Sequence, residues 1–424
     1  MPHTTHPSGP DRQAYVYTNG IAGTKPAIPV SYPHLAAAAQ KKMSREAFAY
    51  VAGGAGLEST LTANRQAFDR WKIVPRMLRD VSVRDMSAQL FNQSLPAPLL
   101  LAPVGVLELA HKDADLAVAK AAGEMGIPMI FSSQASVSME TCTGVMGDGP
   151  RWFQLYWSKS DRLVESLVGR AEACGCTAIV VTLDTTMLGW RTRDLDLAYL
   201  PFLRGKGIAQ YVADPVFQQL LHSFTPQKSK TKINWHTIQT LTQMVKAYPG
   251  SFFKNLRSGE AVAAVQFFIS TYSRPSLTWE DLSFLRSITK LPILLKGILH
   301  VADARLAADH GMDGIIVSNH GGRQVDGALG TLDALPAITE AVGNQLTILL
   351  DSGIRCGADI FKALALGAKG VCVGRPYVYA LALKGQAGVQ ELVQNLLAEF
   401  DLTMGLAGCK NLSEITRDAL LQCG

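Results

Sequence analysis

Eight short apolar runs recur along the chain, and their spacing limits the fold more than any other feature of the sequence. Most of them are separated by stretches with helical periodicity, such as residues 114–122 and 302–308. Strands that alternate with helices are typical of parallel sheets, and eight such units predict an α/β fold of the (β/α)8, or TIM, barrel type. The runs are residues 98–102, 127–131, 152–156, 178–182, 292–296, 314–317, 347–351 and 370–374.

One interval between these runs is much longer than the others. Roughly a hundred residues separate the fourth run from the fifth, far more than a crossover helix needs. The segment contains proline, glycine and aromatic residues, so it is not a low-complexity linker. We therefore expect residues 195–285 to form a partly ordered insertion that acts as a lid at the top of the barrel.

The other boundaries follow from the position of the first run. Residues 1–95 are expected to form an N-terminal extension with a helical segment, and residues 96–424 to form the barrel. Within the first part, Ser44 is the expected N-cap of a helix over residues 45–52. Helical periodicity returns near the end of the chain, over about residues 388–404.

Composition and charge argue against several functions. The net charge of +5 is small for 424 residues, and the one tight basic run, residues 228–232, is short, so we expect no nucleic-acid partner. No apolar stretch approaches the length of a membrane helix, and the polar N-terminus does not resemble a signal peptide. The seven cysteines lack metal-ligand spacing, so we expect no metal site and reduced thiols in a cytoplasmic protein.

The expected strand ends carry many polar and bendable residues, and this is where barrels of this type place their chemistry. The loops after the last two strands, with Gly353, Arg355, Gly374 and Arg375, are typical of loops that bind a phosphate on main-chain N–H groups. We therefore expect a phosphorylated ligand. The candidates at the other strand ends are Pro103, Val104, Gly105, Ser132, Gln154, Thr182, Lys296, Ser318, His320, Arg323 and Asp351.

Several of these residues indicate an acid–base site. His320 and Asp351 follow neighbouring strands, so we expect the carboxylate to orient the imidazole and stabilise its positive form. Arg191 and Arg323 offer two forked cations for a substrate carboxylate, with surface salt bridging as the alternative for Arg191. Lys296 ends an apolar strand, where it could face a flavin ring, form a Schiff base or sit in a buried ion pair.

Together these residues give the chain a specific resemblance. From about residue 32 to residue 420 it resembles the FMN-dependent 2-hydroxy acid oxidising family, which includes glycolate oxidases, lactate oxidases and lactate 2-monooxygenases. The most specific match is SNHGGRQ at 318–324. Further motifs are PRML (75–78), AP (102–103), FQLY (153–156), TLDT (182–185), LGWR (188–191), LKGI (295–298), DSGIR (351–355), KALALGA (362–368) and GRP (374–376). Gly105, the segment 188–203 and the long insertion resemble the lactate 2-monooxygenase type most.

The resemblance implies a role for each matching residue. His320 would be the base that removes a proton from the substrate, and Asp351 would stabilise its imidazolium. The implied substrate-binding residues are Tyr50, Tyr156, Arg191 and Arg323. The implied contacts of a non-covalent FMN are Pro103, Val104, Gly105, Ser132, Gln154, Thr182, Lys296, Ser318 and Asp351, with its phosphate near Gly353, Arg355, Gly374 and Arg375.

The reaction implied is oxidation of a short L-2-hydroxy acid, best matched by L-lactate, with O2 as the acceptor. In the lactate 2-monooxygenase type, lactate yields acetate, CO2 and water, whereas an oxidase would release the 2-oxo acid and hydrogen peroxide. The resemblance also implies a homo-oligomer, a tetramer or larger. Two other classes stay open: another phosphate-binding barrel, such as an aldolase using Lys296 or a nucleotide dehydrogenase using Cys356, and a flavin-binding barrel without turnover.

Overall fold

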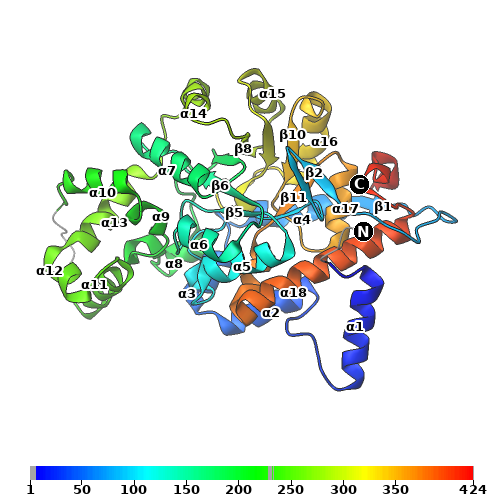
Figure 1. Ribbon diagram of the computed structural model, residues 1–424, viewed down its shortest axis with the longest axis horizontal. Helices are drawn as coiled ribbons and strands as arrows, with labels where there is room; N and C mark the ends of the chain where they lie inside the picture. The colour runs from blue at the N-terminus through cyan, green and yellow to red at the C-terminus, as the bar shows by residue number, and fades with distance from the viewer. Residues whose placement is uncertain (1–5, 228–231, 233, 424) are drawn as a thin grey trace.

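The computed structural model describes residues 6–227, 232 and 234–423, and its centre is a closed barrel of parallel strands (Figure 1). The strand order around the barrel is β10-β11-β4-β5-β6-β7-β8-β9, so the predicted (β/α)8 barrel is confirmed. Each of the eight predicted runs contains or overlaps one strand. The strands are β4 (Leu99–Leu101), β5 (Met129–Phe131), β6 (Arg151–Leu155), β7 (Ile179–Thr182), β8 (Ile293–Ile298), β9 (Gly314–Val317), β10 (Thr347–Leu350) and β11 (Gly370–Val373).

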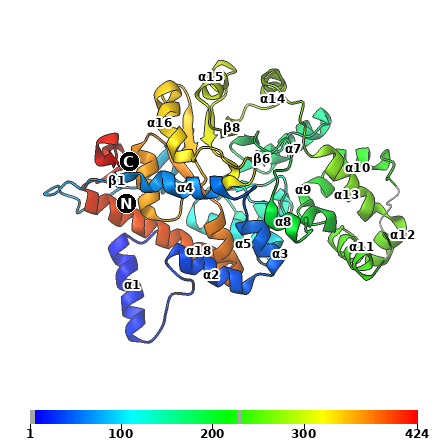
Figure 2. The same ribbon diagram turned by 180° about the vertical axis from the view of Figure 1, so that it is seen from behind.

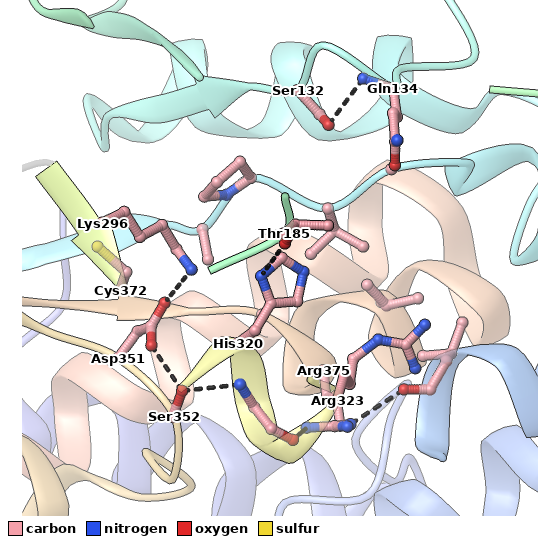
Figure 3. Close-up of a pocket in the computed structure, with 18 of the residues that line it drawn as sticks. Ser132, Gln134, Thr185, Lys296, His320, Arg323, Asp351, Ser352, Cys372 and Arg375 are labelled. Carbon is pink, nitrogen blue, oxygen red and sulfur yellow. Dashed lines mark hydrogen bonds and ion pairs between the residues drawn. The ribbon is translucent and has the colours of Figure 1, made fainter. Parts of the chain in front are cut away.

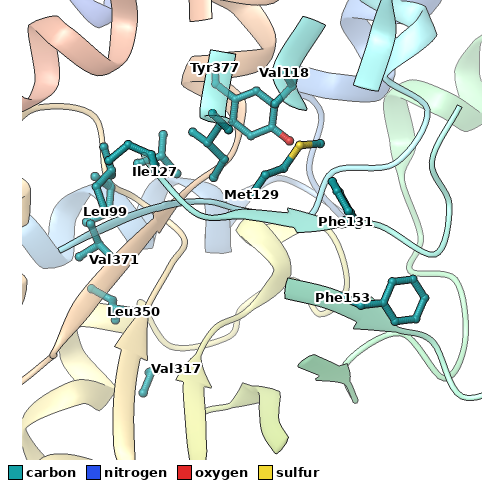
Figure 4. Packing of buried hydrophobic residues seen from close by; sticks show 14 of the residues in the cluster. Leu99, Val118, Ile127, Met129, Phe131, Phe153, Val317, Leu350, Val371 and Tyr377 are labelled. Carbon is teal, nitrogen blue, oxygen red and sulfur yellow. The ribbon is translucent and has the colours of Figure 1, made fainter. Parts of the chain in front are cut away.

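Side chains alternate between the inside and the outside of the barrel because successive residues of a strand point to opposite faces. Leu100 and Cys372, for example, belong to the cluster that fills the interior. Leu99 and Val371 belong to the cluster that packs against the surrounding helices (Figure 4). Those helices are α5 (Ala114–Met125), α6 (Met139–Met146), α7 (Asp161–Ala173), α14 (Leu282–Ile288), α15 (Val301–Asp309), α16 (Thr331–Val342), α17 (Gly357–Ala365) and α18 (Arg375–Ala407).

Helix α18 is longer than the expected helix over residues 388–404, which forms only its second half. A kink at Lys384 and Gly385 divides it, and Gly385 adopts a φ of +58°, which favours glycine. The interruption breaks the apolar periodicity, so the sequence pattern predicts only the part after the kink.

The segment before the barrel contains helices and short strands. Its elements are α1 (Gly9–Ile21), α2 (Tyr32–Lys42), α3 (Arg45–Ala52), α4 (Ser59–Asp69), β1 (Trp71–Ile73), β2 (Ala88–Leu90) and β3 (Gln93–Leu95). The predicted cap is confirmed, because the backbone N–H of Ala47 donates to Ser44 Oγ at 3.2 Å. Strands β2 and β3 pair antiparallel, and their Leu90 and Leu95 pack with the residues inside the barrel. Strand β1 pairs with β12 (Leu420–Gln422) near the C-terminus.

The long interval between β7 and β8 is mostly helical. Its elements are α8 (Thr192–Asp196), η2 (Pro201–Arg204), α9 (Ala209–Val212), α10 (Pro215–His222), α11 (Trp235–Ala247), α12 (Phe252–Ser258), α13 (Glu260–Thr271) and η3 (Trp279–Asp281), before α14. Helices α9 to α13 gather at one end of the molecule in both views (Figures 1 and 2). Tyr211, Phe217 and Phe268 form a buried aromatic cluster among them. Most of the basic run at 228–232 lies outside the described residues.

A helix that crosses a lipid bilayer must be both long and apolar. In residues 6–227, 232 and 234–423, no helix has both properties.

Candidate active site

A cavity opens at the carboxyl ends of the barrel strands, where the sequence predicts the site (Figure 3). It encloses about 1070 Å³ of empty space with its mouth included, which suits a cofactor together with a small substrate. The predicted residues that line it are Tyr50, Pro103, Val104, Gly105, Ser132, Tyr156, Arg191, Lys296, His320, Arg323, Asp351, Gly353, Arg355, Gly374 and Arg375. Gln154, Thr182 and Ser318 are buried directly behind this wall, next to Ser132 or Lys296.

The loop after β9 explains why a buried strand ends in a histidine and two glycines. His320, Gly321 and Gly322 all have positive φ angles, of 57°, 65° and 75°. A side chain at Gly321 would meet the guanidinium of Arg375, and one at Gly322 would meet the backbone of Leu61 at 2.8 Å. Glycine is therefore required at both positions, and the tight turn aims the imidazole of His320 into the cavity (Figure 3).

The imidazole of His320 pairs with a carboxylate that differs from the predicted one. His320 Nδ1 lies 2.7 Å from Asp184 Oδ1, and Thr185 Oγ1 is 3.2 Å from the same nitrogen. Asp351 instead pairs with Lys296, with 3.1 Å between Oδ2 and Nζ. The expectation that Asp351 orients the imidazole is therefore wrong, and Asp184 takes that place.

The backbone at the end of β8 allows this pairing across an intervening strand. Asp184 follows β7 and His320 follows β9, with β8 between them. Gly297 in β8 has a φ of +109°, and a Cβ there would lie 2.8 Å from the Cβ of Asp184. The register of the strand also shifts between Lys296 and Ile298. A glycine inside a strand often marks such a close approach, and here it lets Asp184 cross the strand end to reach the imidazole.

The electrostatics of this pair favour a neutral imidazole beside an ionised carboxylate. Burial lowers the pKa of His320 below its ordinary value, although the charge of Asp184 opposes this shift. Burial disfavours the charge on Asp184, but the positive charges and hydrogen bonds around it outweigh burial and lower its pKa to about 2. Because Nδ1 faces Asp184, Nε2 is the ring nitrogen that can accept a proton from a ligand.

Lys296 forms a second buried ion pair in the wall of the cavity. Burial disfavours the ammonium, but the carboxylates of Asp351 and Asp184 outweigh it and raise the pKa of Lys296. Its Nζ donates to Ser318 Oγ at 2.9 Å, and the same hydroxyl accepts the backbone N–H of His320 at 3.1 Å. Ser318 thus connects Lys296 to the loop that carries His320. Because its pKa is raised, Lys296 remains a cation.

Arg191 and Arg323 line the cavity, and in the described part of the chain their guanidinium groups bind backbone and amide oxygens. Arg323 donates to the carbonyls of Tyr50 and Gly53, and Arg191 donates to the carbonyl of Arg323 and the amide oxygen of Gln324. Within the described residues, neither arginine forms an ion pair. Burial and the charge of Arg191 lower the pKa of Arg323 to about 9, so the group remains charged at neutral pH. Arg191 is buried and Arg323 is half-buried. Two such cations that form no ion pair favour binding of an anion.

The two predicted tyrosines lie on the same cavity. Arg323 stacks over the ring of Tyr50 at 4.9 Å from its centroid. Tyr156 is buried, and burial raises the pKa of its hydroxyl, so that hydroxyl remains a hydrogen-bond donor at any working pH.

The comparison with known proteins agrees with this geometry. Residues 39–422 match the family of FMN-dependent dehydrogenases. The chain belongs to this family. FMN is therefore its cofactor, and the protein is an oxidoreductase of 2-hydroxy acids.

Named relatives of this FMN-dependent dehydrogenase cover nearly the whole chain. An FMN-dependent alpha-hydroxy acid dehydrogenase, qulF, of Penicillium citrinum is 41% identical over 96% of this chain and 94% of its own. An L-lactate oxidase of Lysinibacillus sphaericus is 40% identical over 93% of both chains. Mandelate oxidase, in a crystal structure with benzoyl-formic acid, is 36% identical in sequence to this chain. The match covers 93% of this chain and 98% of the mandelate oxidase chain, and the two structures superpose with a TM-score of 0.74.

The wall of the cavity fits a flavin ring. Among the described residues, the buried Gln154 Nε2 and Thr182 Oγ1 have no hydrogen-bond partner. Gln154 Oε1 is occupied by Ser132, whose hydroxyl donates to it at 3.2 Å. A buried donor without a partner costs stability, so these two atoms fit a ligand with polar ring edges. Lys296 adds a positive charge on the same side.

The loops after β10 and β11 fit the phosphate of FMN. Gly353 has a φ of +133°, which favours glycine. The space beside Gly374 is open, because a Cβ there would lie no closer than 3.7 Å to any neighbouring atom of the chain. Arg355 stacks on Tyr32 at 4.5 Å and lines the cavity. Arg375 lines it too, although three of its nitrogens already donate to backbone carbonyls. The backbone of these loops and Arg355 are therefore better placed than Arg375 to hold a phosphate here.

The cavity also includes residues that the sequence analysis did not assign. Phe202 belongs to η2 of the insertion, and its ring meets Tyr50 edge-on at 6.5 Å. Tyr272 follows α13 of the same insertion. Their positions depend on how a long helical segment folds back, and no local pattern in the sequence indicates this. The others are Val51, Ala102, Gln134, Thr185, Leu188, Gly321, Ser352, Ile354, Cys372 and Val378.

Proposed function

We propose that this FMN-dependent oxidoreductase oxidises L-lactate with O2 as the acceptor and that the outcome is of the lactate 2-monooxygenase type. The observation that carries the proposal is the pair of guanidinium groups without an ion pair, Arg191 and Arg323, on the same cavity as the neutral base His320. A substrate with a carboxylate next to a carbon that loses a proton matches this arrangement.

The residues of the chain act on such a substrate in distinct ways. Arg191 and Arg323 bind the carboxylate, and the hydroxyls of Tyr50 and Tyr156 donate to substrate oxygens. His320 Nε2 accepts the proton that leaves the substrate, and Asp184 stabilises the imidazolium that forms. When bound, FMN would supply the two-electron oxidant for this step, with O2 as the final acceptor.

The flavin contacts are part of the same proposal. The strand-end residues would hold its ring, and the glycine loops after β10 and β11 would hold its phosphate. The ring contacts proposed are Pro103, Val104, Gly105, Ser132, Gln154, Thr182 and Lys296, with Ser318 and Asp351 holding Lys296 in place.

The preference for lactate rests on similarity and on the size of the site. The relative named L-lactate oxidase is 40% identical, and the human relative named 2-hydroxyacid oxidase 1 is 38% identical over 89% of this chain and 93% of its own. Phe202, Tyr272 and Leu188 line the same cavity as the base, and their bulk favours a short side chain.

The fate of pyruvate decides between two outcomes. If pyruvate remains bound while O2 is reduced, peroxide formed beside it decarboxylates it, and lactate plus O2 gives acetate, CO2 and water. If pyruvate leaves first, the enzyme is an oxidase that releases pyruvate and hydrogen peroxide. The insertion supplies Phe202 and Tyr272 to the cavity, which supports slow escape of the product.

Product analysis in air tests this proposal. Purified enzyme would turn over L-lactate with and without catalase, because free peroxide also decarboxylates pyruvate in solution. We expect acetate and CO2 in equal amounts, unchanged by catalase. Pyruvate that accumulates one-for-one with lactate in the presence of catalase would instead assign the oxidase reaction.

The aldolase and thiol alternatives fit the structure poorly. A Schiff-base lysine must be neutral, whereas Asp351 and Asp184 raise the pKa of Lys296 despite its burial. Burial raises the pKa of the Cys356 thiol to about 12, which leaves little thiolate for attack. A flavin protein without turnover would not need a neutral histidine paired with Asp184 beside two guanidinium groups that form no ion pair.

We further propose that the protein is cytoplasmic and assembles as a homotetramer or larger. Large apolar side chains are exposed on two adjoining loops, with Leu57 94% exposed and Trp190 72%. These loops are joined by hydrogen bonds, such as Gly56 N–H to the carbonyl of Trp190 at 2.9 Å. Contact between copies would cover such a surface. Light scattering coupled to size exclusion measures the mass, and a monomer would contradict the proposal.

A further inference from the structure

The side chain of Gln324 connects two loops of the active site through four hydrogen bonds. Its Nε2 donates to the carbonyls of Asp184 and Met187, at 2.7 and 2.8 Å. Its Oε1 accepts from Arg191 Nη2 at 3.0 Å and from the backbone N–H of Gly189 at 3.4 Å. This one amide therefore binds the segment 184–191 at four residues, Asp184, Met187, Gly189 and Arg191.

The partners also fix the orientation of this amide. Two carbonyl oxygens lie on one side and two N–H donors on the other, so reversing the amide would oppose all four contacts. The segments lie close enough for this because Gly189 has no side chain: a Cβ there would lie 2.5 Å from the carbonyl oxygen of Arg323. The contact is thus built into the backbone of both loops.

The amide also determines which part of Arg191 is free. Arg191 Nε donates to the carbonyl of Arg323 at 3.3 Å, and its Nη2 donates to Gln324. Among the contacts of the described residues, these two are the only hydrogen bonds of this guanidinium, and Nη1 takes part in neither. The loop after β9 therefore holds Nε and Nη2 of Arg191. Nη1 remains available to a ligand in the cavity that Arg191 lines.

We infer that Gln324 is a positioning residue for substrate binding: its amide holds Arg191 toward the substrate carboxylate and ties the main chain of Asp184 to the loop that carries His320. Gln324 itself is not among the cavity-lining residues, so it acts through Arg191 and Asp184. The inference rests on the proposed role of Arg191 in binding the substrate.

Two substitutions separate the functions of the amide. Gln324→Met keeps the length of the side chain and removes all four hydrogen bonds. Gln324→Glu keeps an acceptor for Arg191, removes both donors, and gives the guanidinium a counter-charge that competes with the substrate carboxylate. Val325→Ala is the matched control, because Val325 is the next residue and its side chain is 66% exposed. FMN content and thermal unfolding of each variant show whether the fold is retained.

The measurement is the Kd of pyruvate for the oxidised, FMN-loaded enzyme, by calorimetric titration. We expect Gln324→Met to raise the Kd on the order of 10-fold, the usual effect of losing a hydrogen bond to a charged group. Gln324→Glu should raise it at least as much, and Val325→Ala should leave it unchanged. A Kd within about twofold of wild type in a folded Gln324→Met or Gln324→Glu variant would overturn the inference.

A double-mutant cycle with Arg191→Met shows whether Gln324 acts through Arg191. The two single effects should add only in part, because without Arg191 the amide has no guanidinium left to position. Full additivity would overturn the inference. This test does not depend on the identity of the substrate. If L-lactate does not reduce the flavin of the wild-type enzyme, the lactate proposal fails. The same mutant cycle is then measured with the 2-oxo acid that corresponds to whichever 2-hydroxy acid does reduce the flavin.

Discussion

His320 Nδ1 lies 2.7 Å from Asp184 Oδ1, although the strands that carry these residues are separated by β8. The contact fixes which nitrogen of the imidazole faces the cavity, because Nδ1 is engaged and Nε2 is not. It also provides a negative charge for the imidazolium that would form when the base takes a proton. The acid–base site therefore depends on three strand ends.

Asp184→Asn should slow reduction of the bound flavin without releasing it. The amide is the same size, but it carries no charge to stabilise the imidazolium, so we expect a loss on the order of 10²-fold or more. Anaerobic stopped-flow spectroscopy measures the rate. Asp196→Asn is the control, because the carboxylate of Asp196 lies a short way along the chain and is exposed. A rate close to wild type in Asp184→Asn would assign the stabilising charge elsewhere.

The pH dependence of kcat/KM should have an acidic limb that reports His320. Burial lowers the pKa of this imidazole below its ordinary value, so the base is neutral and active at pH 7 and is lost as the pH falls through the lowered pKa. Asp184 raises the pKa of His320, so Asp184→Asn should move the limb to still lower pH. Movement of the limb to higher pH in this variant would contradict the assignment.

Gly374→Ala should weaken FMN binding while leaving the apoprotein stable. A Cβ at this position comes no closer than 3.7 Å to the chain, but it enters the space assigned to the phosphate. Crowding a packed site costs about 1–3 kcal/mol, which corresponds to a Kd raised on the order of 10-fold or more. Fluorescence titration of apoprotein with FMN measures it. Unchanged affinity would place the phosphate elsewhere.

Phe202→Ala should shift the products from acetate and CO2 toward pyruvate and peroxide. Phe202 is the side chain by which η2 of the insertion closes the cavity next to Tyr50, so its loss opens a path for pyruvate. The products are quantified in the presence of catalase. Phe253→Ala, at an 80% exposed position in α12, is the control. An unchanged acetate yield from folded, FMN-loaded Phe202→Ala would argue against the lid, which stays a prediction for residues 195–285.

The strands and the location of the site follow from short-range patterns, which is why both could be predicted. Apolar runs bounded by glycine or polar residues mark strands buried on both faces, and the fold then fixes the end at which the chemistry lies. The partner of His320 could not be found this way. Neighbouring strands suggested Asp351, whereas the actual contact depends on the backbone of Gly297, whose missing side chain lets Asp184 cross β8. The glycine in LKGI was a signal of a close approach, but it does not say which residue approaches.

The insertion shows a different limit. Its existence follows from spacing alone, but the contributions of Phe202 and Tyr272 to the cavity arise from tertiary packing of helices far apart in sequence. Arg375 is similar: the sequence places it beside the phosphate loop, but only the fold shows that its donors are used by the carbonyls of Val51, Gly53 and Gly321.

Anaerobic reduction of the enzyme-bound FMN by L-lactate tests the central claim most directly. Wild-type enzyme mixed with L-lactate under nitrogen should lose its flavin absorbance in a saturable reaction, whereas D-lactate should not produce this loss. His320→Ala should retain FMN and be reduced on the order of 10²–10⁴-fold more slowly, because the base that accepts the proton is missing. Oxidised flavin that persists in the wild type with L-lactate, or a His320→Ala variant reduced at the wild-type rate, would contradict the account.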